Sequence, residues 1–489
     1  MERLMTSVPA ARTRRRASSM VVKTAAANRC RRWGLLIAGR RLAQGPGGDK
    51  RNDRCEAPRA GSAHTRACAG VGPQRGLCRG RRSGTRRAMS IPVPPVPSFP
   101  PAALTLTSVP GLRAAGVRAG IKASGNPDVG LLVADEAVPA AGLFTQNHFA
   151  AAPVLLSREH LAKSGGRVRA VVVNSGNANA CTGEDGARDA REMCTRVAGA
   201  LGCPVEQVLV CSTGVIGVKL PMDRVRAGID AALAQLAGDV EAGRRFLHAI
   251  MTTDAYPKEA CARLGRGVVA GICKGAGMIE PNMATMLGFL STDLQLSPAE
   301  LQAALPRLAA GSFNAVHVDT HTSTNDTLLL LATGRTPRAA GWEEAAAQVA
   351  HRLAWLIARD GEGATKVTTI EVTGAESDAA AREIAKLVAA SALVRTALYG
   401  NDPNWGRFTS QVGNARAVRN ARALTCVLQG IEVFRGGEPT AFDRAAASRA
   451  MAQEDVRLEL RLADGPGRAV VLTSDLGYRY VQVNAEYTT

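Results

Sequence analysis

Strand-like apolar runs alternate with helix-period segments along most of this chain, and that alternation restricts the fold to a mixed α/β class. The run RVRAVVVNSG at 167–176 predicts a buried strand that ends in a turn, and Ala190 and Met193 after it belong to a helical pattern. The run VEQVLVCSTG at 205–214 predicts a second strand, followed by a second helix. The folded body should begin near Leu104 and hold about 385 residues, which favours two lobes.

The same alternation continues to the C-terminus. Ser297 and Glu300, with Pro298 between them, form a capping box that predicts the start of a helix. The remaining segments are predicted as a strand at 326–334, a helix at 342–361, and strands at 366–375, 468–476 and 478–484. No repeat of fixed period occurs in the sequence, which excludes a solenoid.

The formal net charge of +19 is concentrated at the N-terminus. Residues 1–88 hold 20 Arg and two Lys against four acidic residues, so they carry +18, and the rest of the chain carries +1. A protein that binds nucleic acid needs its basic residues on the folded body. The charge distribution therefore argues against nucleic acid as a partner.

Residues 1–95 are predicted to be a transit peptide followed by a Pro-rich linker. The leader is rich in Arg, Ala and Ser and poor in acidic residues, which is typical of organelle targeting, and its apolar run WGLLIAG is too short for a secretory signal. The segment 90–111 is Pro-rich and indicates an extended linker. The alternative is that Met89 is the true start, which would make the protein cytoplasmic.

Membrane and metal partners are not expected. No apolar run approaches the ~18 residues of a membrane-spanning helix. Seven of the 11 cysteines lie beyond the leader, an odd number without a CxxC pair, so neither a disulfide framework nor a zinc site is indicated. This cysteine usage favours a reducing compartment.

The stretch KGAGMIEPNMATMLGF at 274–289 is the first candidate for chemistry. It fails as a phosphate-binding loop, because its Lys precedes the glycines and Glu280 stands where a dinucleotide motif needs Gly. A Thr whose chain is cut just before it gains a free α-amine, of pKa roughly 7.7–8.0, as a general base for its own hydroxyl. Cleavage between Ala284 and Thr285 would make Thr285 such a nucleophile, although a Thr after Ala in an apolar run is more often a packing residue.

An acyl-transfer site also needs hydrogen-bond donors for the oxyanion. The turn CSTGVIG at 211–217 offers the Thr213 hydroxyl and the Gly214 amide, although alone it is a common strand-to-helix turn. Glu362 lies between glycines, where backbone can approach a ligand closely. A charged loop residue is, however, usually only solvated, and this is the alternative for the cluster DGEGATK at 360–366. The cluster NSGNANACTG at 174–183 suits a tight turn or a pocket wall, and the turn is favoured. The cluster DTHTSTND at 319–326 has the spacing of no calcium loop or HExxH zinc site, and such runs usually form turns and helix caps.

Taken together and in this order, these motifs closely resemble the arginine-biosynthetic glutamate N-acetyltransferase family, also called ornithine acetyltransferase. The resemblance covers roughly residues 105–489. It rests on KGAGMIEPNMATML, CSTGVIG, NSGNANACTG, IMTTDAYPK, TSTND, DGEGATK, GNDPNWGR and the terminal NAEYTT.

The resemblance implies an acetyltransferase that works through an acetyl-Thr intermediate. Members of the family take an acetyl group from N2-acetylornithine and pass it to glutamate, and some also accept acetyl-CoA as the donor. By the family pattern Thr285 is the nucleophile, and Thr213 and Gly214 form the oxyanion hole. The implied substrate-binding residues are Thr252 (or its neighbour Thr253), Lys274, Thr285, Glu362, Asn484 and Thr489.

The residue chemistry agrees with these roles. Both substrates are α-amino-acid derivatives, so one cation for a carboxylate and one anion for an ammonium are the minimum electrostatic complement. Lys274 and Glu362 supply this pair. His321 departs from the family pattern, where a smaller or acidic residue is expected, which affects only the prediction for the local turn.

The resemblance further implies an α+β fold, an αββα-type sandwich without a metal. The precursor would cut itself between Ala284 and Thr285 into an alpha chain, 96–284, and a beta chain, 285–489, which stay together in a heterotetramer. The long leader is absent from bacterial relatives, which favours an organelle form, in a chloroplast rather than a mitochondrion.

Two alternatives remain open on the sequence. One is an amidohydrolase or aminopeptidase with a processed N-terminal nucleophile, in which water takes the acyl group. The other is an amino-acid-binding protein that never cuts itself.

Overall fold

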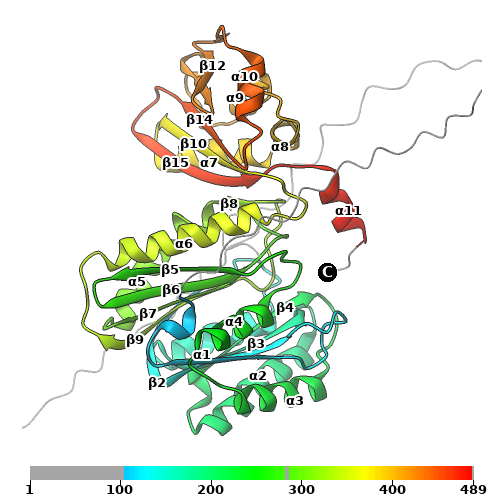
Figure 1. Cartoon of the computed structure of the whole chain (residues 1–489), viewed down its shortest axis with the longest axis vertical. Coiled ribbons are helices and arrows are strands. Elements are labelled where there is room, and N and C mark those ends of the chain that lie inside the picture. Colours follow the sequence, from blue (N-terminus) through cyan, green and yellow to red (C-terminus); the bar gives the residue numbers. More distant parts are fainter. Residues whose placement is uncertain (1–103, 281–285, 487–489) are drawn as a thin grey trace, which may run out of the picture. The chain divides into compact units, whose positions relative to one another are not determined.

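A computed structural model describes residues 104–280 and 286–486. The predicted cleavage residues Ala284 and Thr285, the terminal Thr489 and the leader lie outside the described residues. The described part is a mixed α/β structure with two sheets, as the sequence predicted (Figure 1).

Eight strands form the first sheet, in the order β4-β3-β2-β9-β7-β6-β5, with β1 paired to β2 beside this path. Its strands are β1 Leu112–Val117, β2 Val129–Phe144, β3 Arg167–Asn177, β4 Val208–Val215, β5 Lys258–Leu264, β6 Gly267–Lys274, β7 Leu287–Leu294 and β9 Thr327–Thr336. The second sheet has the order β13-β12-β11-β14-β10-β15-β8. Its strands are β8 Val316–His317, β10 Val367–Ala375, β11 Thr425–Leu428, β12 Ile431–Arg435, β13 Glu438–Pro439, β14 Asp455–Arg461 and β15 Gly467–Ser474.

The α-helices fill the connections between these strands. They are α1 Ala152–Lys163, α2 Gly183–Leu201, α3 Met222–Ala234, α4 Val240–Ile250, α5 Pro298–Ala310, α6 Trp342–Arg359, α7 Asp378–Ala390, α8 Ala392–Tyr399, α9 Trp405–Gly413, α10 Arg444–Ala450 and α11 Tyr478–Glu486. The predicted capping box is present at the start of α5, where the Ser297 side chain accepts from the Glu300 amide.

The long strand β2 joins the two halves of the first sheet. Its first part pairs with β1 and β3, and after an irregularity between Val133 and Val138 its last part pairs with β9. Successive side chains of a strand point to opposite faces. Leu131 accordingly packs with α2 and α3 in one core, whereas Leu132 packs with α4 in another. Burial of both faces explains why these strands are continuous apolar runs.

The core around α4 is shared by both halves of the first sheet. Phe246 of α4 contacts Phe289 of β7 edge-on, with ring centroids 5.3 Å apart. On the other face of β5, β6 and β7, helices α5 and α6 cover a separate core. A fourth core lies between the second sheet and helices α7 and α9.

One predicted strand is wrong. The segment 478–484 forms helix α11, although its sequence alternates like a strand. The neighbouring strand β15 is already paired on both edges, with β10 and with β8, so this segment has no edge of β15 to join. No residue of α11 is buried, so the helix does not contribute to a core.

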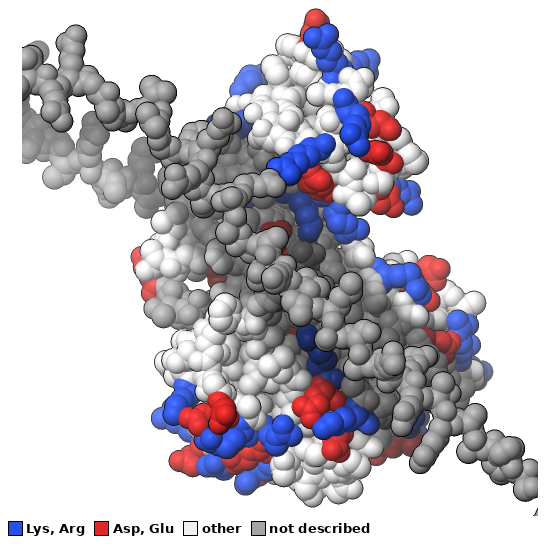
Figure 2. Space-filling view, turned by 180° about the vertical axis from the view of Figure 1, so that it is seen from behind, with Lys and Arg blue, Asp and Glu red and all other residues white. Residues whose placement is uncertain are grey.

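The visible described surface mixes charges of both signs. In Figure 2, Lys and Arg lie among Asp and Glu where the described surface is visible. Exposed side chains of opposite charge form ion pairs such as Arg196–Asp230. Within the described residues, none of the helices is both long and apolar enough to cross a membrane.

Candidate functional site

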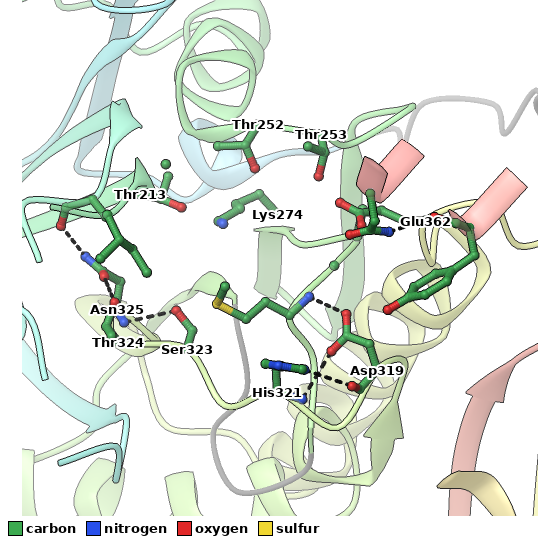
Figure 3. A pocket seen from close by; sticks show the side chains of 18 residues that line it. Thr213, Thr252, Thr253, Lys274, Asp319, His321, Ser323, Thr324, Asn325 and Glu362 are labelled. Carbon is green, nitrogen blue, oxygen red and sulfur yellow. Dashed lines mark hydrogen bonds between the residues drawn. The ribbon is translucent and has the colours of Figure 1, made fainter. Parts of the chain in front are cut away.

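Six of the predicted site residues line one cavity. They are Thr213, Gly214, Thr252, Lys274, Glu362 and Asn484. Thr213 and Glu362 approach the cavity from opposite sides, and Lys274 lies between them (Figure 3). The cavity has a volume of about 210 Å³. Pockets for drug-sized ligands have roughly 300–1,000 Å³, so this volume favours a small metabolite as the ligand.

The oxyanion candidates stand at the end of β4. This strand is parallel to β3, and Gly214 lies opposite Gly176. The φ angle of Gly214 is 132°, and a Cβ there would come within 2.3 Å of the Gly176 carbonyl carbon. Only glycine fits such a close approach of two backbones. The local backbone therefore explains the glycine, and Thr213 beside it borders the cavity.

The turn 319–326 borders the cavity and is fastened to the ends of β3 and β4. The side-chain amide of Asn325 donates from Nδ2 to the Ala178 carbonyl at 2.6 Å and to the Ser212 carbonyl at 2.9 Å. His321 also lines the cavity, with its ring Nδ1 3.0 Å from the Asp319 carbonyl. The prediction of a turn was therefore incomplete, because this segment is also part of the cavity wall.

Carboxylates of the same turn hold the backbone on both sides of residues 281–285. Asp319 accepts from the amides of Met278 and Ile279, at 2.5 and 2.8 Å. Asp326 accepts from the amide of Met286 at 3.0 Å. Burial raises the pKa of Asp319, although its backbone hydrogen bonds oppose the rise, and burial raises the pKa of Asp326 well above its usual range.

Lys274 is the cation of the cavity. It ends β6, where it pairs with Leu287 of β7, and it is 3% exposed. Burial lowers the pKa of its ammonium group, whereas the carboxylates of Asp254, Asp326 and Glu362 raise it. An ammonium group in this position can bind a ligand carboxylate.

Glu362 is the opposing anion. Its amide donates to the Ala276 carbonyl at 2.9 Å, which joins the loop after α6 to the segment after β6. A Cβ on Gly277 would come within 2.4 Å of the Glu362 carboxyl carbon, so the glycine leaves room for that side chain.

Helix α11 brings Asn484 and Tyr480 to the cavity. The Asn484 side chain donates to the Tyr480 carbonyl one turn earlier, at 3.0 Å. At Gly363, whose φ is 75°, a Cβ would lie 2.4 Å from the Tyr480 amide, so α11 sits closely against the loop that carries Glu362.

Several cavity residues were missed by sequence reasoning. Tyr480 is four residues before Asn484, a spacing that places both on one helix face, but the segment was predicted as a strand. The sequence pattern assigned Asp319 and Asn325 only to a turn. Their hydrogen bonds to backbone groups far away in the sequence are not indicated by any pattern in the neighbouring residues. The missed residues include Met278, Asp319, Ser323, Thr324, Asn325 and Tyr480.

The arrangement suits acyl transfer between amino acids. A hydroxyl and a backbone amide at Thr213 and Gly214 are the kind of donors that stabilise an oxyanion. A cation and an anion on different walls complement the carboxylate and ammonium groups of an amino acid.

Comparison with known proteins places the chain in a family. The model of the ArgJ family matches residues 113–489. The arginine biosynthesis bifunctional protein ArgJ of Rhodopirellula baltica is 47% identical over 397 residues, covering 78% of this chain and 96% of that protein. The protein of the same name from Thermus thermophilus is 46% identical over 385 residues, covering 78% and 98%.

A solved structure is also similar in sequence. Ornithine acetyltransferase from Mycobacterium tuberculosis, complexed with ornithine, is 42% identical and covers 37% of this chain and 95% of that chain, with a TM-score of 0.35. The family model matches the chain from the second residue of β1 to residue 489. The chain belongs to the ArgJ family.

Proposed function

We propose that this protein is a glutamate N-acetyltransferase of arginine biosynthesis that transfers the acetyl group of N2-acetylornithine to glutamate. The observation that carries this proposal is the single cavity that collects Thr213, Gly214, Lys274 and Glu362 in a member of the ArgJ family. Acetyl-CoA is a second candidate donor, and the proposed chemistry needs no other cofactor.

The proposed reaction has two half-reactions. The Thr285 hydroxyl attacks the acetyl carbonyl of acetylornithine, and its proton passes to the α-amine of Thr285. The oxyanion accepts hydrogen bonds from the Thr213 hydroxyl and the Gly214 amide. The C–N bond then breaks, the proton moves to the leaving amine, and ornithine departs. The amine of glutamate attacks the acetyl-Thr ester in the same way and releases acetylglutamate.

Substrate binding is proposed to use the two charges of the cavity. Lys274 would hold a carboxylate and Glu362 an ammonium group, with Thr252 and Asn484 as hydrogen-bonding partners. Thr489, which lies outside the described residues, is proposed to complete the site.

The α-amine of Thr285 requires a cut before that residue. We propose that the precursor cleaves itself between Ala284 and Thr285, and that the alpha and beta chains stay together as a heterotetramer with the αββα sandwich and two lobes of the family. The anchoring of Met278, Ile279 and Met286 by Asp319 and Asp326 supports this, because it fixes the backbone on both sides of the proposed cut.

Residues 1–95 are proposed to direct the protein to an organelle, with a chloroplast favoured over a mitochondrion. A mass spectrum of the protein from its native source tests this. A mature alpha chain that begins between Met1 and the folded body at a residue other than Met89 or Ser90 supports the transit peptide, whereas an alpha chain that begins at Met89, or at Ser90 after removal of Met89, would indicate a cytoplasmic protein.

Acetyl transfer is tested with purified protein and acetylornithine, with and without glutamate. We expect acetylglutamate and ornithine to form in equal amounts when glutamate is present, and little turnover without it. Equal release of ornithine in both reactions, without acetylglutamate, would identify a hydrolase. A single full-length band on a denaturing gel, with no turnover, would identify a binding protein.

The oxyanion role is tested at Thr213. Thr213→Ala should slow both self-cleavage and acetyl transfer, with kcat reduced about 10²- to 10³-fold, because one donor to the oxyanion is lost. The rates are measured by gel densitometry and by acetylglutamate formation. Thr213→Ser keeps the hydroxyl and should retain most of the activity. An alanine variant with wild-type kcat would remove Thr213 from the mechanism.

A further inference from the structure

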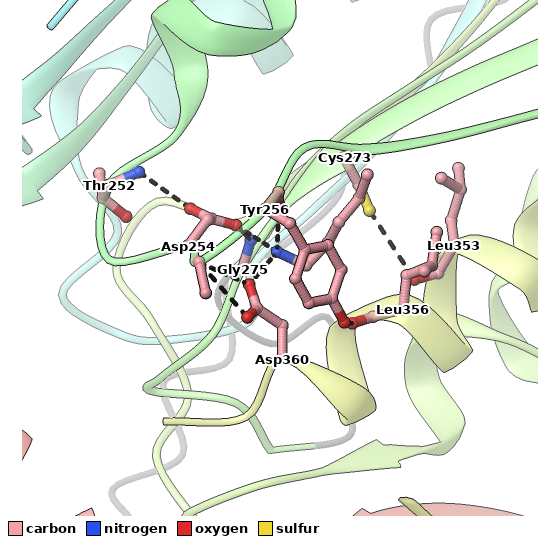
Figure 4. Close-up of polar contacts among 10 residues, drawn as sticks. Thr252, Asp254, Tyr256, Cys273, Gly275, Leu353, Leu356 and Asp360 are labelled. Carbon is pink, nitrogen blue, oxygen red and sulfur yellow. Dashed lines mark hydrogen bonds and ion pairs between the residues drawn. The ribbon is translucent and has the colours of Figure 1, made fainter. Parts of the chain in front are cut away.

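Three charged side chains are buried together beside the cavity. Lys258 Nζ lies 2.6 Å from Asp254 Oδ1 and 2.5 Å from Asp360 Oδ2, and the three side chains are 0%, 0% and 4% exposed (Figure 4). Lys258 begins β5, Asp254 lies in the loop before it, and Asp360 directly follows α6. We call these residues the buried triad.

The triad is closed to ligands. The Lys258 ammonium group is 3.5 Å from the Tyr256 carbonyl and lies over the Tyr256 ring, 5.1 Å from its centroid, so all its surroundings are protein. Although burial opposes it, the two carboxylates raise the pKa of Lys258. Despite burial, Lys258 and Lys274 hold the pKa of Asp254 at about 2. The charges therefore act on their neighbours and not on a substrate directly.

The carboxylates of the triad hold the loops that carry cavity residues. Asp254 accepts from the amide of Thr252 at 2.9 Å and from the amide of Gly275, next to Lys274, at 2.7 Å. Asp360, two residues before Glu362, accepts from the amide of Ala255 at 3.0 Å. Thr252, Lys274 and Glu362 come from three separate segments, and the triad connects all three.

Stability alone is a weak reason for such a cluster. Removing three charges from water is costly, and well-packed apolar residues often stabilise a fold as well as a buried ion pair does. What apolar residues cannot supply is acceptors for the Thr252 and Gly275 amides and a negative charge beside Lys274.

We propose that Asp254 is a positioning residue of the acetyltransferase site, which fixes Thr252 and Lys274 through their backbone and places a negative charge beside the Lys274 ammonium group. Asp254 does not touch the substrate. The inference rests on the proposed function, because it assigns the substrate carboxylate to Lys274.

Hydrogen bonds separate Asp254 from Asp360, because Asp254 accepts from the Gly275 amide next to Lys274, whereas Asp360 accepts from the Ala255 amide. The described groups that act electrostatically on Lys274 come from several elements. They are Asp254 and Lys258 around the start of β5, Asp326 before β9, Glu362 after α6, Lys122 between β1 and β2, and the adjacent Cys273. Asp254 and Asp360 are therefore a matched pair, since each is buried and bonded to Lys258, but of the two only Asp254 is also hydrogen-bonded to the backbone next to Lys274.

The test compares Asp254→Asn with Asp360→Asn. Each variant leaves one carboxylate paired with Lys258, so both should fold with lowered thermal stability. Loss of the Asp254 charge lowers the pKa of Lys274 further, because burial is then opposed by fewer anions. Lys274 binds a carboxylate only when protonated. Binding of the substrate carboxylate should therefore fail at a lower pH in Asp254→Asn than in the wild type, with a smaller change in Asp360→Asn, whose carboxylate is not bonded to the backbone next to Lys274.

The probe is N2-acetylnorvaline, measured as a competitive inhibitor of acetylornithine between pH 6 and 10. It carries an acetyl group and a carboxylate but no amine, and a carboxylate does not titrate in this range, so the pH dependence of its inhibition constant reports the enzyme. We also expect Asp254→Asn to raise KM for acetylornithine about 10-fold at neutral pH, more than it lowers kcat, because a charge-assisted contact is misplaced.

The alkaline limit is the pH above which N2-acetylnorvaline no longer inhibits. A limit that moves equally in both variants, or in neither, would overturn the inference. If Asp254→Asn does not fold, Asp254→Glu replaces it. That change keeps the negative charge but displaces the carboxylate that accepts from the Thr252 and Gly275 amides, so KM should rise while the alkaline limit stays in place, and an unchanged KM would overturn the inference. Acetyl transfer by the wild type is measured alongside, so that a failure of the proposed function is recognised separately.

Discussion

Replacing Thr285 with Ala is expected to leave the chain uncut and to lower acetyl transfer by more than about 10³-fold. The change removes the only atom of the enzyme proposed to attack a carbonyl, both in the self-cleavage and in the first half-reaction, and without the cut no α-amine is available as a base. A denaturing gel should show one full-length band. N-terminal sequencing of the wild type should yield a chain that begins Thr-Met-Leu-Gly.

Thr285→Ser is the matched variant, because it keeps a hydroxyl at the same position. We expect it to be cut and to transfer acetyl groups at a reduced rate, which would show that the loss in Thr285→Ala comes from the hydroxyl. Acetyl transfer by uncut Thr285→Ala protein would mean that another residue is the nucleophile.

Much of the fold could be predicted because both faces of its main strands are buried. The runs at 167–176 and 205–214 give β3 and β4, and the helical spacing after them gives α2 and α3. The error at 478–484 has a tertiary cause. Alternating Tyr and Val favour a strand locally, but whether a strand forms depends on a free sheet edge, and both edges of β15 are occupied.

The residues of the site also divide into those that the sequence could predict and those that it could not. Thr213 and Gly214 were accessible to sequence reasoning because a turn after a buried strand exposes such groups, whereas Lys274 and Glu362 depended on the family resemblance. The contacts of Asp319 and Asp254 could not be predicted. Asp319 accepts from backbone amides about 40 residues away in the sequence. Asp254 and Lys258 are close in sequence, but they do not lie in a helix, and the third member of the triad is a carboxylate 102 residues beyond Lys258. Such contacts follow from the packing of distant segments.

Lys274→Met should leave self-cleavage intact and lower kcat/KM for both acetylornithine and glutamate by about 10²- to 10³-fold, because losing one partner of a buried charge pair costs about 2–5 kcal/mol. Met preserves much of the length and apolar stem of Lys, so the change is mainly one of charge. Self-cleavage is spared because its proposed groups are Thr285, Thr213 and Gly214, none of which needs the ammonium group. The two readouts are the fraction of cut chain on a gel and the initial rate of acetylglutamate formation.

Lys366→Met provides the control for Lys274→Met. Lys366 is also a buried lysine, and its ammonium group donates to the Leu398 carbonyl at 2.9 Å, but it does not line the cavity. Its replacement should reduce thermal stability without raising KM for either substrate. If both variants lost activity in proportion to their loss of stability, the effect at Lys274 would be structural. If Lys274→Met alone lost activity while remaining cut and stable, its charge must act on the substrate, since the nucleophile and the oxyanion donors are unchanged.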